Sequence, residues 1–287
     1  MQPQEHAAPS TRPGRVASVR RAEAQPPRLD GAMRSRVVLG PADVDRVDPL
    51  LALVEDWMRP PGGFPDHPQR GFEALTLVLE GRVVHADSSG GRATLAPGDG
   101  AWTTAGRGII HSEAPEGDGE AHLLRLWVNL PALEKRRPPR HQVVRASEVP
   151  VLRGEGVAVR VVAGEQLGVR GPAESVVQVL LLDADVRKGC EVLVALPPDR
   201  RGIAYVLRGA VELDGRTVRA GEAAFLDAGP LAAIRAQAIV ADARFVLASG
   251  APIGEPVVAD GAFVMPTAEE IAQAYEDQRA GRIGREG

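Results

Sequence analysis

Two short segments carry side chains that could bind a metal ion. One is His67-Pro68-Gln69 and the other is His111-Ser112-Glu113. If each segment is a strand, its first and third residues point to the same face. Imidazole combined with a carboxylate suits Fe(II), Mn, Ni, Cu or Zn better than Ca or Mg. The alternative is that these are ordinary histidines of turns and core, and the spacing alone leaves both interpretations open.

The surrounding chain has the pattern of short strands joined by turns. Apolar runs alternate with Gly, Pro and Asp, which predicts a sandwich or barrel. The clearest strands are residues 75–79, 122–128, 176–182 and 203–207. One helix is expected at the C-terminus, because Thr267 precedes Glu270 by three residues in a capping-box pattern. We therefore predict an all-β protein with a short C-terminal helix.

An internal repeat indicates two similar halves. Residues 79–84 resemble residues 207–212, and residues 97–102 resemble residues 220–225. Duplicate barrels are the simplest explanation. The repeat offset places apolar residues where the first half has polar ones: His67, Gln69, His111 and Glu113 fall near Ala195, Pro197, Ile234 and Ala236. No histidine follows His141, so we expect only the first barrel to hold a metal.

Several motifs resemble those of pirins, which are bicupins of the cupin superfamily. Residues 62–73 resemble the first metal motif of that family, and residues 105–113 resemble the second. Residues 126–130 and 263–267 are also similar to pirin sequences. The resemblance extends from about residue 16 to about residue 284, and it implies two tandem cupin-type β-barrels.

The resemblance also implies a four-ligand metal site. The matching residues are His67, His111 and Glu113, while Gln69 stands where the family usually has histidine. Gln69 can offer a carbonyl oxygen, a weaker ligand than imidazole, so we expect weaker metal retention than in a four-ligand relative. Two histidines and one carboxylate have the composition of the facial triad of non-haem Fe(II) oxygenases. Glu73 matches a ligand of many general cupins, but the pirin pattern makes it a neighbour of the ligands.

Two functions follow from the resemblance, and the sequence leaves both open. The first is a quercetinase-like flavonol dioxygenase, that is, a quercetin 2,3-dioxygenase-type oxidoreductase in which Glu113 is the catalytic base and the substrate is a flavonol-like small molecule. The second is a non-catalytic, metal- or redox-responsive regulator that binds a transcription factor or a metabolic enzyme. The expected cofactor is one divalent transition metal, with Fe(II) favoured over Ni, Cu, Mn or Zn. A site that has lost its metal is a third alternative, supported only by Gln69.

The expected boundaries follow from composition and from the repeat. They are a disordered tail at 1–14, a first barrel with the metal site at 15–135, a linker at 136–147, a second barrel without a metal site at 148–265, and the C-terminal helix and tail at 266–287. The formal net charge is −4, which does not favour direct contact with nucleic acid.

The remaining sequence features point to ordinary structural roles and to the cytoplasm. No apolar stretch has the length of a signal peptide or a membrane span, and Cys190 is the only cysteine, so a cytoplasmic protein is expected. His85 and His122 are interpreted as structural histidines on strands. His141 lies beside the linker without polar neighbours at ligand spacing.

Overall fold

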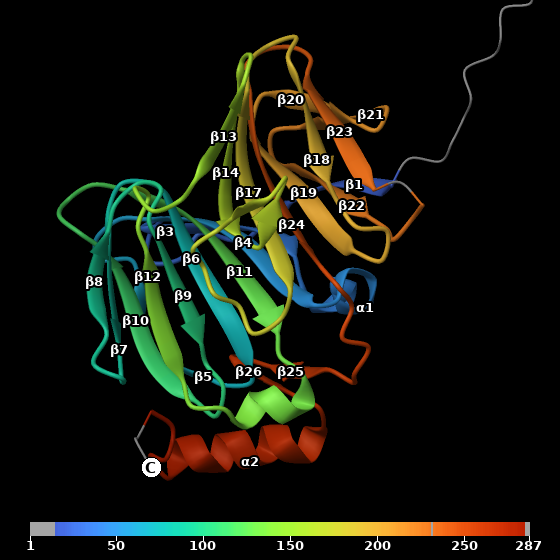
Figure 1. The fold of residues 1–287 in the computed structure, drawn as a ribbon. Helices are drawn as coiled ribbons and strands as arrows, with labels where there is room; N and C mark the ends of the chain where they lie inside the picture. Colours follow the sequence, from blue (N-terminus) through green and yellow to red (C-terminus); the bar gives the residue numbers. More distant parts are fainter. Residues whose placement is uncertain (1–14, 231, 285–287) are drawn as a thin grey trace, which may run out of the picture.

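The computed structural model describes residues 15–230 and 232–284. The tail expected at residues 1–14 therefore lies outside the described range. The chain forms two β-barrels, and helix α2 (Ala268–Arg279) lies against the first of them (Figure 1). The expected all-β architecture with a short C-terminal helix is confirmed. None of the described helices is long and apolar enough to cross a membrane.

The first barrel is built from two antiparallel sheets. The seven-stranded sheet has the order β12 (Arg140–Val144), β9 (Gly100–Thr104), β6 (Phe72–Glu80), β11 (Ala121–Asn129), β4 (Leu50–Met58), β3 (Met33–Leu39) and β2 (Glu23–Ala24). The four-stranded sheet has the order β5 (Phe64–Gln69), β10 (Ile109–Pro115), β7 (Val83–Asp87) and β8 (Arg92–Leu95).

The second barrel repeats this plan. Its seven-stranded sheet has the order β1 (Val16–Arg21), β22 (Glu222–Leu226), β19 (Arg201–Arg208), β24 (Ala243–Gly250), β17 (Val179–Val186), β14 (Val157–Ala163) and β13 (Val151–Gly154). Its four-stranded sheet has the order β18 (Glu191–Ala195), β23 (Ala233–Ala238), β20 (Ala210–Leu213) and β21 (Arg216–Arg219). The two barrels therefore correspond strand for strand.

Short elements connect these sheets. They are the 3-10 turn η1 (Pro41–Asp43), helix α1 (Val44–Val47), the 3-10 turn η2 (Ala132–Arg136), and the two-stranded pairs β15 (Glu165–Gln166) with β16 (Val169–Arg170) and β25 (Val258–Asp260) with β26 (Phe263–Met265). Helix α2 begins as predicted, because the side chain of Thr267 accepts a hydrogen bond from the backbone N–H of Glu270 at 3.2 Å.

Two edge strands depart from the expected boundaries. β1, expected in the first barrel, pairs with β22 of the second, where Val19 lies opposite Ala224. β12 lies within the expected linker, yet it pairs with β9 of the first barrel. Each strand fills the same edge of its seven-stranded sheet, because the exposed hydrogen-bonding groups of β9 and β22 both need a partner. The chain thus crosses between the barrels at both of these strands.

The internal repeat is visible in the backbone. Gly81 and Gly209 end matching strands with φ angles of 73° and 75°, a left-handed conformation that favours glycine. Downstream, Asp99 accepts a hydrogen bond from the N–H of the residue three positions before it at 3.1 Å, and Glu222 does the same at 2.9 Å. Similar turns thus recur at the positions that the sequence repeat indicated.

The two barrels share one hydrophobic cluster, so they are joined by core-like packing. Leu75 and Leu126 of the first barrel and Ile203 and Phe225 of the second all belong to this cluster. Within it, Tyr205 donates a hydrogen bond to Glu55 across the interface at 2.6 Å. The relative position of the barrels is therefore fixed by buried apolar contact and by a directional polar one.

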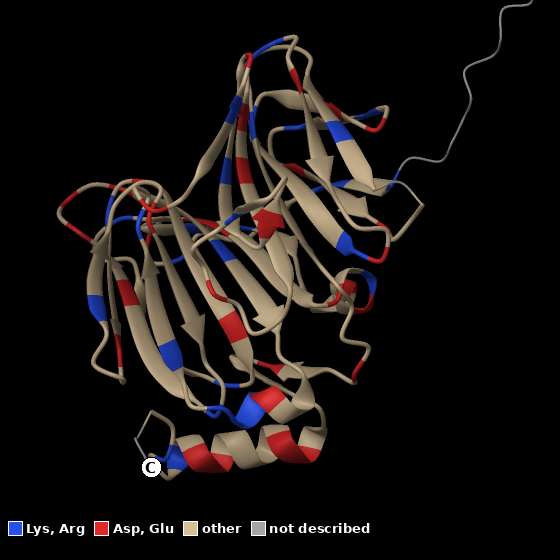
Figure 2. Cartoon of the chain, viewed as in Figure 1, with Lys and Arg blue, Asp and Glu red and all other residues tan. Residues whose placement is uncertain are grey.

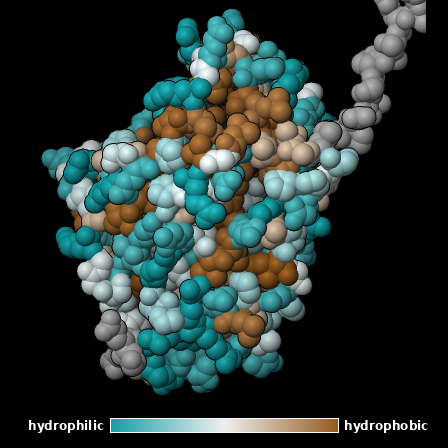
Figure 3. Space-filling model, in the orientation of Figure 1, coloured by the Kyte–Doolittle hydropathy of each residue, from teal (hydrophilic) through white to brown (hydrophobic). Residues whose placement is uncertain are grey.

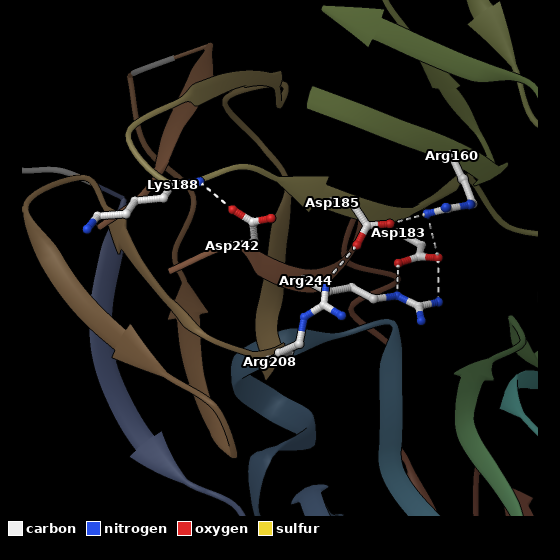
Figure 4. Close-up of polar contacts among 7 residues, drawn as sticks. All are labelled: Arg160, Asp183, Asp185, Lys188, Arg208, Asp242 and Arg244. Carbon is white, nitrogen blue, oxygen red and sulfur yellow. Dashed lines mark hydrogen bonds and ion pairs between the residues drawn. The ribbon is translucent and has the colours of Figure 1, made fainter. Parts of the chain in front are cut away.

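A group of ion pairs extends this interface on the second barrel (Figure 4). Arg244 binds Asp183 through two hydrogen bonds of 2.9 Å, and Arg160 contacts both Asp183 and Asp185. Asp183 is two residues after Leu181, a member of the shared cluster, so both side chains point to the same face of β17. These arginines neutralise a buried carboxylate at the border of the interface.

Candidate metal centre

Strands β5 and β10 bring the two predicted metal motifs together. His67 lies opposite His111 in the register of the two strands, and their ring centroids are 4.3 Å apart. Gln69, two residues after His67, lies opposite Ile109 and is 1% exposed. Glu113 is 2% exposed and follows His111 on the same face of β10. The structure thus places all four predicted residues in one part of the four-stranded sheet.

The protonation states of His111 and Glu113 suit metal binding. Burial lowers the pKa of His111 to about 3, helped by the nearby His67 and His85. Burial raises the pKa of Glu113, but the contact with His85 and the positive charge of Arg125 help to outweigh it, and this pKa is lowered to about 2. At neutral pH the imidazole is neutral and the carboxylate is ionised. These are the forms in which both groups act as ligands.

The orientations of His67 and Gln69 leave ligand atoms free. Nδ1 of His67 lies 2.9 Å from the backbone oxygen of Pro65, so the ring donates its proton there and Nε2 keeps a lone pair. Oε1 of Gln69 is buried without a hydrogen-bond partner among the described residues. The same holds for both ring nitrogens of His111 and for Oε1 of Glu113. Unpartnered buried polar atoms are rare, and a bound ion would satisfy these.

The structure adds His85, which the sequence analysis interpreted as structural. Strand β7 places His85 opposite Glu113, with His85 Nδ1 3.5 Å from Glu113 Oε1. Donor atoms of His85, His111 and Glu113 all lie within 4.8 Å of one another, and His67 is outside this group. Local sequence spacing gave no signal for this cluster, because His85 joins it only through the pairing of β7 with β10. The residues present therefore fit one divalent transition metal.

Glu73 and Arg70 have structural partners. Glu73 accepts hydrogen bonds from Thr104 at 2.6 Å and from the backbone of Val176 at 3.0 Å, so it ties the first barrel to a loop of the second. Arg70 binds Asp277 of α2 at 2.7 Å and the backbone oxygen of Arg107 at 2.6 Å. The segment between the two motifs and the C-terminal helix are thereby held against each other.

The inner face of the equivalent sheet of the second barrel is apolar. Strand pairing matches His111 and Glu113 to Ile234 and Ala236, as the repeat offset predicted. For the first motif, the offset was wrong by one residue. His67 lies opposite His111 in the first barrel, and the residue opposite Ile234 in the second is Val194 and not Ala195. By the same register, His85 matches Leu213. The second-barrel residues that match His67, His85, His111 and Glu113 are at most 1% exposed and belong to the core of that barrel. They are Val194, Leu213, Ile234 and Ala236.

Two duplicate barrels, one polar at its centre and one apolar, define a bicupin with its candidate metal centre in the first barrel. The Pirin family matches residues 39–128, and the Pirin C-terminal cupin domain matches residues 181–284. A pirin-like protein of Caulobacter vibrioides is 39% identical over 90% of this chain and 95% of its own length. The chain belongs to the pirin family.

Solved structures share the fold. One from Acinetobacter baumannii, described as quercetin 2,3-dioxygenase, has a TM-score of 0.84 at 28% identity and covers 94% of this chain and 98% of its own. The bacterial pirin YhhW of Escherichia coli, solved in complex with nickel(II), has a TM-score of 0.68 at 22% identity and covers 82% of this chain and 99% of its own. At that identity, the second likeness shows the two-barrel fold alone.

Proposed function

We propose that the first barrel binds one divalent transition metal, favouring Fe(II), and oxidises a flavonol-like small molecule as a quercetin 2,3-dioxygenase-type enzyme. The observation that carries this proposal is the set of buried, unpartnered donor atoms on β5 and β10. His67, His111 and Glu113 are the proposed ligands, and the amide oxygen of Gln69 is the fourth. Support also comes from the likeness to the Acinetobacter protein described as quercetin 2,3-dioxygenase.

The bound ion would supply charge stabilisation for the flavonol oxygen and sites for substrate and O2. The chain's own residues have separate tasks. Glu113 is ionised, so it can accept the proton of a flavonol hydroxyl, and its low pKa makes it a weak base. His85 Nδ1 lies 3.5 Å from this carboxylate, so the imidazole borders it without a short hydrogen bond. Gln69, His111 and Glu113 are at most 5% exposed, and this burial would limit the access of water to the reacting atoms.

Oxygen uptake by metal-loaded protein tests this proposal. Protein freed of metal and reloaded with Fe(II) should consume O2 only when quercetin is added, and the flavonol absorbance should fall in step. Free Fe(II) at the same concentration and the reloaded His111→Ala variant are the controls. Uptake no greater than that of free Fe(II) would exclude a flavonol dioxygenase while leaving the metal site itself open to a direct binding measurement.

An apolar groove on the second barrel favours regulation as a second candidate function. The groove has a volume of about 720 Å³ and is lined by apolar side chains that include Leu152, Leu167 and Leu193. Leu167 is 70% exposed and Leu193 is 57% exposed, and Figure 3 shows hydrophobic residues gathered on this barrel. Such exposed apolar surface is typical of a partner-binding site. In this role, the metal state of the first barrel would alter binding of a transcription regulator or a metabolic enzyme.

Hydrogen exchange distinguishes this regulatory role from the enzymatic one. Loading the metal should change amide exchange in β13 and β18, the strands that border the groove, if the metal state is transmitted to the second barrel. Identical exchange in these strands with and without metal would contradict a metal-responsive regulator. Figure 2 shows Lys and Arg positions interspersed with Asp and Glu positions along the ribbon, and the formal net charge is −4, so direct nucleic-acid contact is not part of either proposal.

A further inference from the structure

A second group of potential ligands lies beside the first. Donor atoms of His85, Asp87 and His141 all lie within 4.8 Å of one another. Asp87 Oδ2 is 3.5 Å from His85 Nε2 and 3.5 Å from His141 Nδ1. The rings of His85 and His141 are stacked, with centroids 4.4 Å apart. The carboxylate oxygen is therefore shared by two imidazoles on the same side of it.

The strands of two sheets build this group. β7 carries His85 and Asp87 at alternate positions, so both side chains point to the same face. β12 carries His141 opposite Thr103 of β9. Strand β12 lies within residues 136–147, which were expected to form a linker. For that reason His141 was not predicted to lie near the other histidines. The edge strand of the larger sheet thus completes a cluster that begins on the smaller sheet.

Hydrogen bonds hold the carboxylate in place but leave one oxygen free. Asp87 Oδ1 accepts from the backbone N–H of Ser89 at 2.8 Å, from the Ser89 hydroxyl at 2.5 Å and from the backbone N–H of Gly91 at 3.3 Å. The other oxygen of the carboxylate, Oδ2, faces the two histidines.

Two of the atoms that face one another, His85 Nε2 and Asp87 Oδ2, have no hydrogen-bond partner among the described residues. His85 Nδ1 and His141 Nε2 also have none, whereas His141 Nδ1, the atom that faces Asp87, lies near the Thr103 hydroxyl. The side chains of His85, Asp87 and His141 are 1%, 0% and 8% exposed. A separation of 3.5 Å is too long for a good hydrogen bond. It matches the spacing of roughly 3.4 Å between two atoms that bind one tetrahedral ion at about 2.1 Å each.

We propose that His85 Nε2, Asp87 Oδ2 and His141 Nδ1 form a second site for a divalent transition metal, separate from the site of His67, Gln69, His111 and Glu113. The two sites use different atoms of His85. Its Nδ1 lies 3.5 Å from Glu113 Oε1 and its Nε2 lies 3.5 Å from Asp87 Oδ2, so with the ring proton on Nδ1 the lone pair of Nε2 is available to the ion. His141 Nδ1 is 3.3 Å from the Thr103 hydroxyl, a contact that the ion replaces.

Zinc binding measured by equilibrium dialysis tests the second site on the full chain. The wild type should bind two equivalents of Zn²⁺. His141→Gln and Asp87→Asn should each bind one at the same zinc concentration, because both variants replace a ligand of the second site by a neutral amide, a weaker ligand, and nearly preserve side-chain volume. His111→Ala should also bind one, and the double variant His111→Ala/His141→Gln should bind none. His122→Gln, which changes a histidine outside both groups, should still bind two.

The outcomes separate the two sites. If the wild type binds one equivalent that is lost in His111→Ala and kept in His141→Gln, the second site is wrong and the first stands. If the one equivalent is lost in His141→Gln and kept in His111→Ala, the second site stands and the proposed function loses its metal. Two equivalents in both His141→Gln and Asp87→Asn would also contradict the second site. Thermal unfolding of each variant without metal shows whether a lost equivalent reflects a lost fold.

Discussion

The four-stranded sheets of the two barrels share one topology and differ in what they bury. In the first barrel, β5, β10 and β7 direct His67, His111, Glu113 and His85 inward. The matching positions of the second barrel carry aliphatic residues that are part of its core. The backbone plan is therefore compatible with either a packed apolar interior or a cluster of ligands. The side chains at these few positions decide which barrel contributes stability alone and which offers chemistry.

The most severe test places a ligand of the first barrel in the second. Ala236→Glu puts a carboxylate where Glu113 stands in the first barrel, but Ala236 is 0% exposed and lies among aliphatic neighbours. A buried charge without partners costs at least about 3–5 kcal/mol, so we expect little folded protein. Circular dichroism and denaturant unfolding measure the effect. Ala241→Glu, on an exposed residue of the same barrel, should leave stability nearly unchanged.

The next test uses one matched pair of positions. His111→Ala should abolish metal binding at the first site, keep only the equivalent of the second site, and leave the fold intact, because it removes a ligand and two unpartnered nitrogens. Ile234→Ala, at the equivalent position, should keep the metal and lower the free energy of unfolding by about 2–5 kcal/mol through a cavity. Metal analysis and urea unfolding of both variants decide. If His111→Ala retained as much metal as the wild type, His111 would not be a ligand, and the proposed difference between a metal-binding first barrel and a purely structural second barrel would be contradicted.

Gln69 sharpens the comparison within the first barrel. Gln69→His should tighten metal binding by at least about tenfold, since even changes to groups around the ligands alter affinity by about 10–100-fold. Gln69→Leu should weaken binding if the amide oxygen is a ligand. Competition with a chelator measures both. Equal affinity in all three proteins would show that position 69 does not contact the ion.

The smallest expected effect concerns the support that only the first barrel receives from α2. Burial raises the pKa of Asp277, but hydrogen bonds from Arg70, Arg282 and Gln273 lower it from 3.8 to about 2. The ionised carboxylate therefore stabilises the fold above pH 4, and this contribution is lost as the pH falls from about 4 to 2. Asp277→Asn should remove that part of the acid sensitivity, worth at most about 1 kcal/mol. Thermal unfolding of both proteins at pH 6 and pH 3 tests it.

Local patterns in the sequence predicted the positions of strands and helices better than they predicted which strands pair with one another. The repeat, the barrels and the Thr267 cap were predicted because turns and caps depend on neighbouring residues. The sequence did not predict that β1 pairs with β22 of the second barrel or that β12 pairs with β9 of the first. The alternation of apolar and polar residues in a strand does not encode which distant sheet edge that strand will join. His141 was overlooked for the same reason. The ligand assignments of His67, Gln69, His111 and Glu113 stay predictions until metal is measured.

The pairing of β1 with β22 has a consequence for biosynthesis. Val16 lies opposite Leu226, so one half of this strand pair is made long before the other. At about 5–20 residues per second, the ribosome needs roughly 10–40 s to synthesise the intervening chain. During that time β1 has no native partner, and the first barrel can form before the second is closed. A fragment that ends before β22 would leave β1 as an unpaired, aggregation-prone strand, so neither barrel can be expressed as a simple half of the gene.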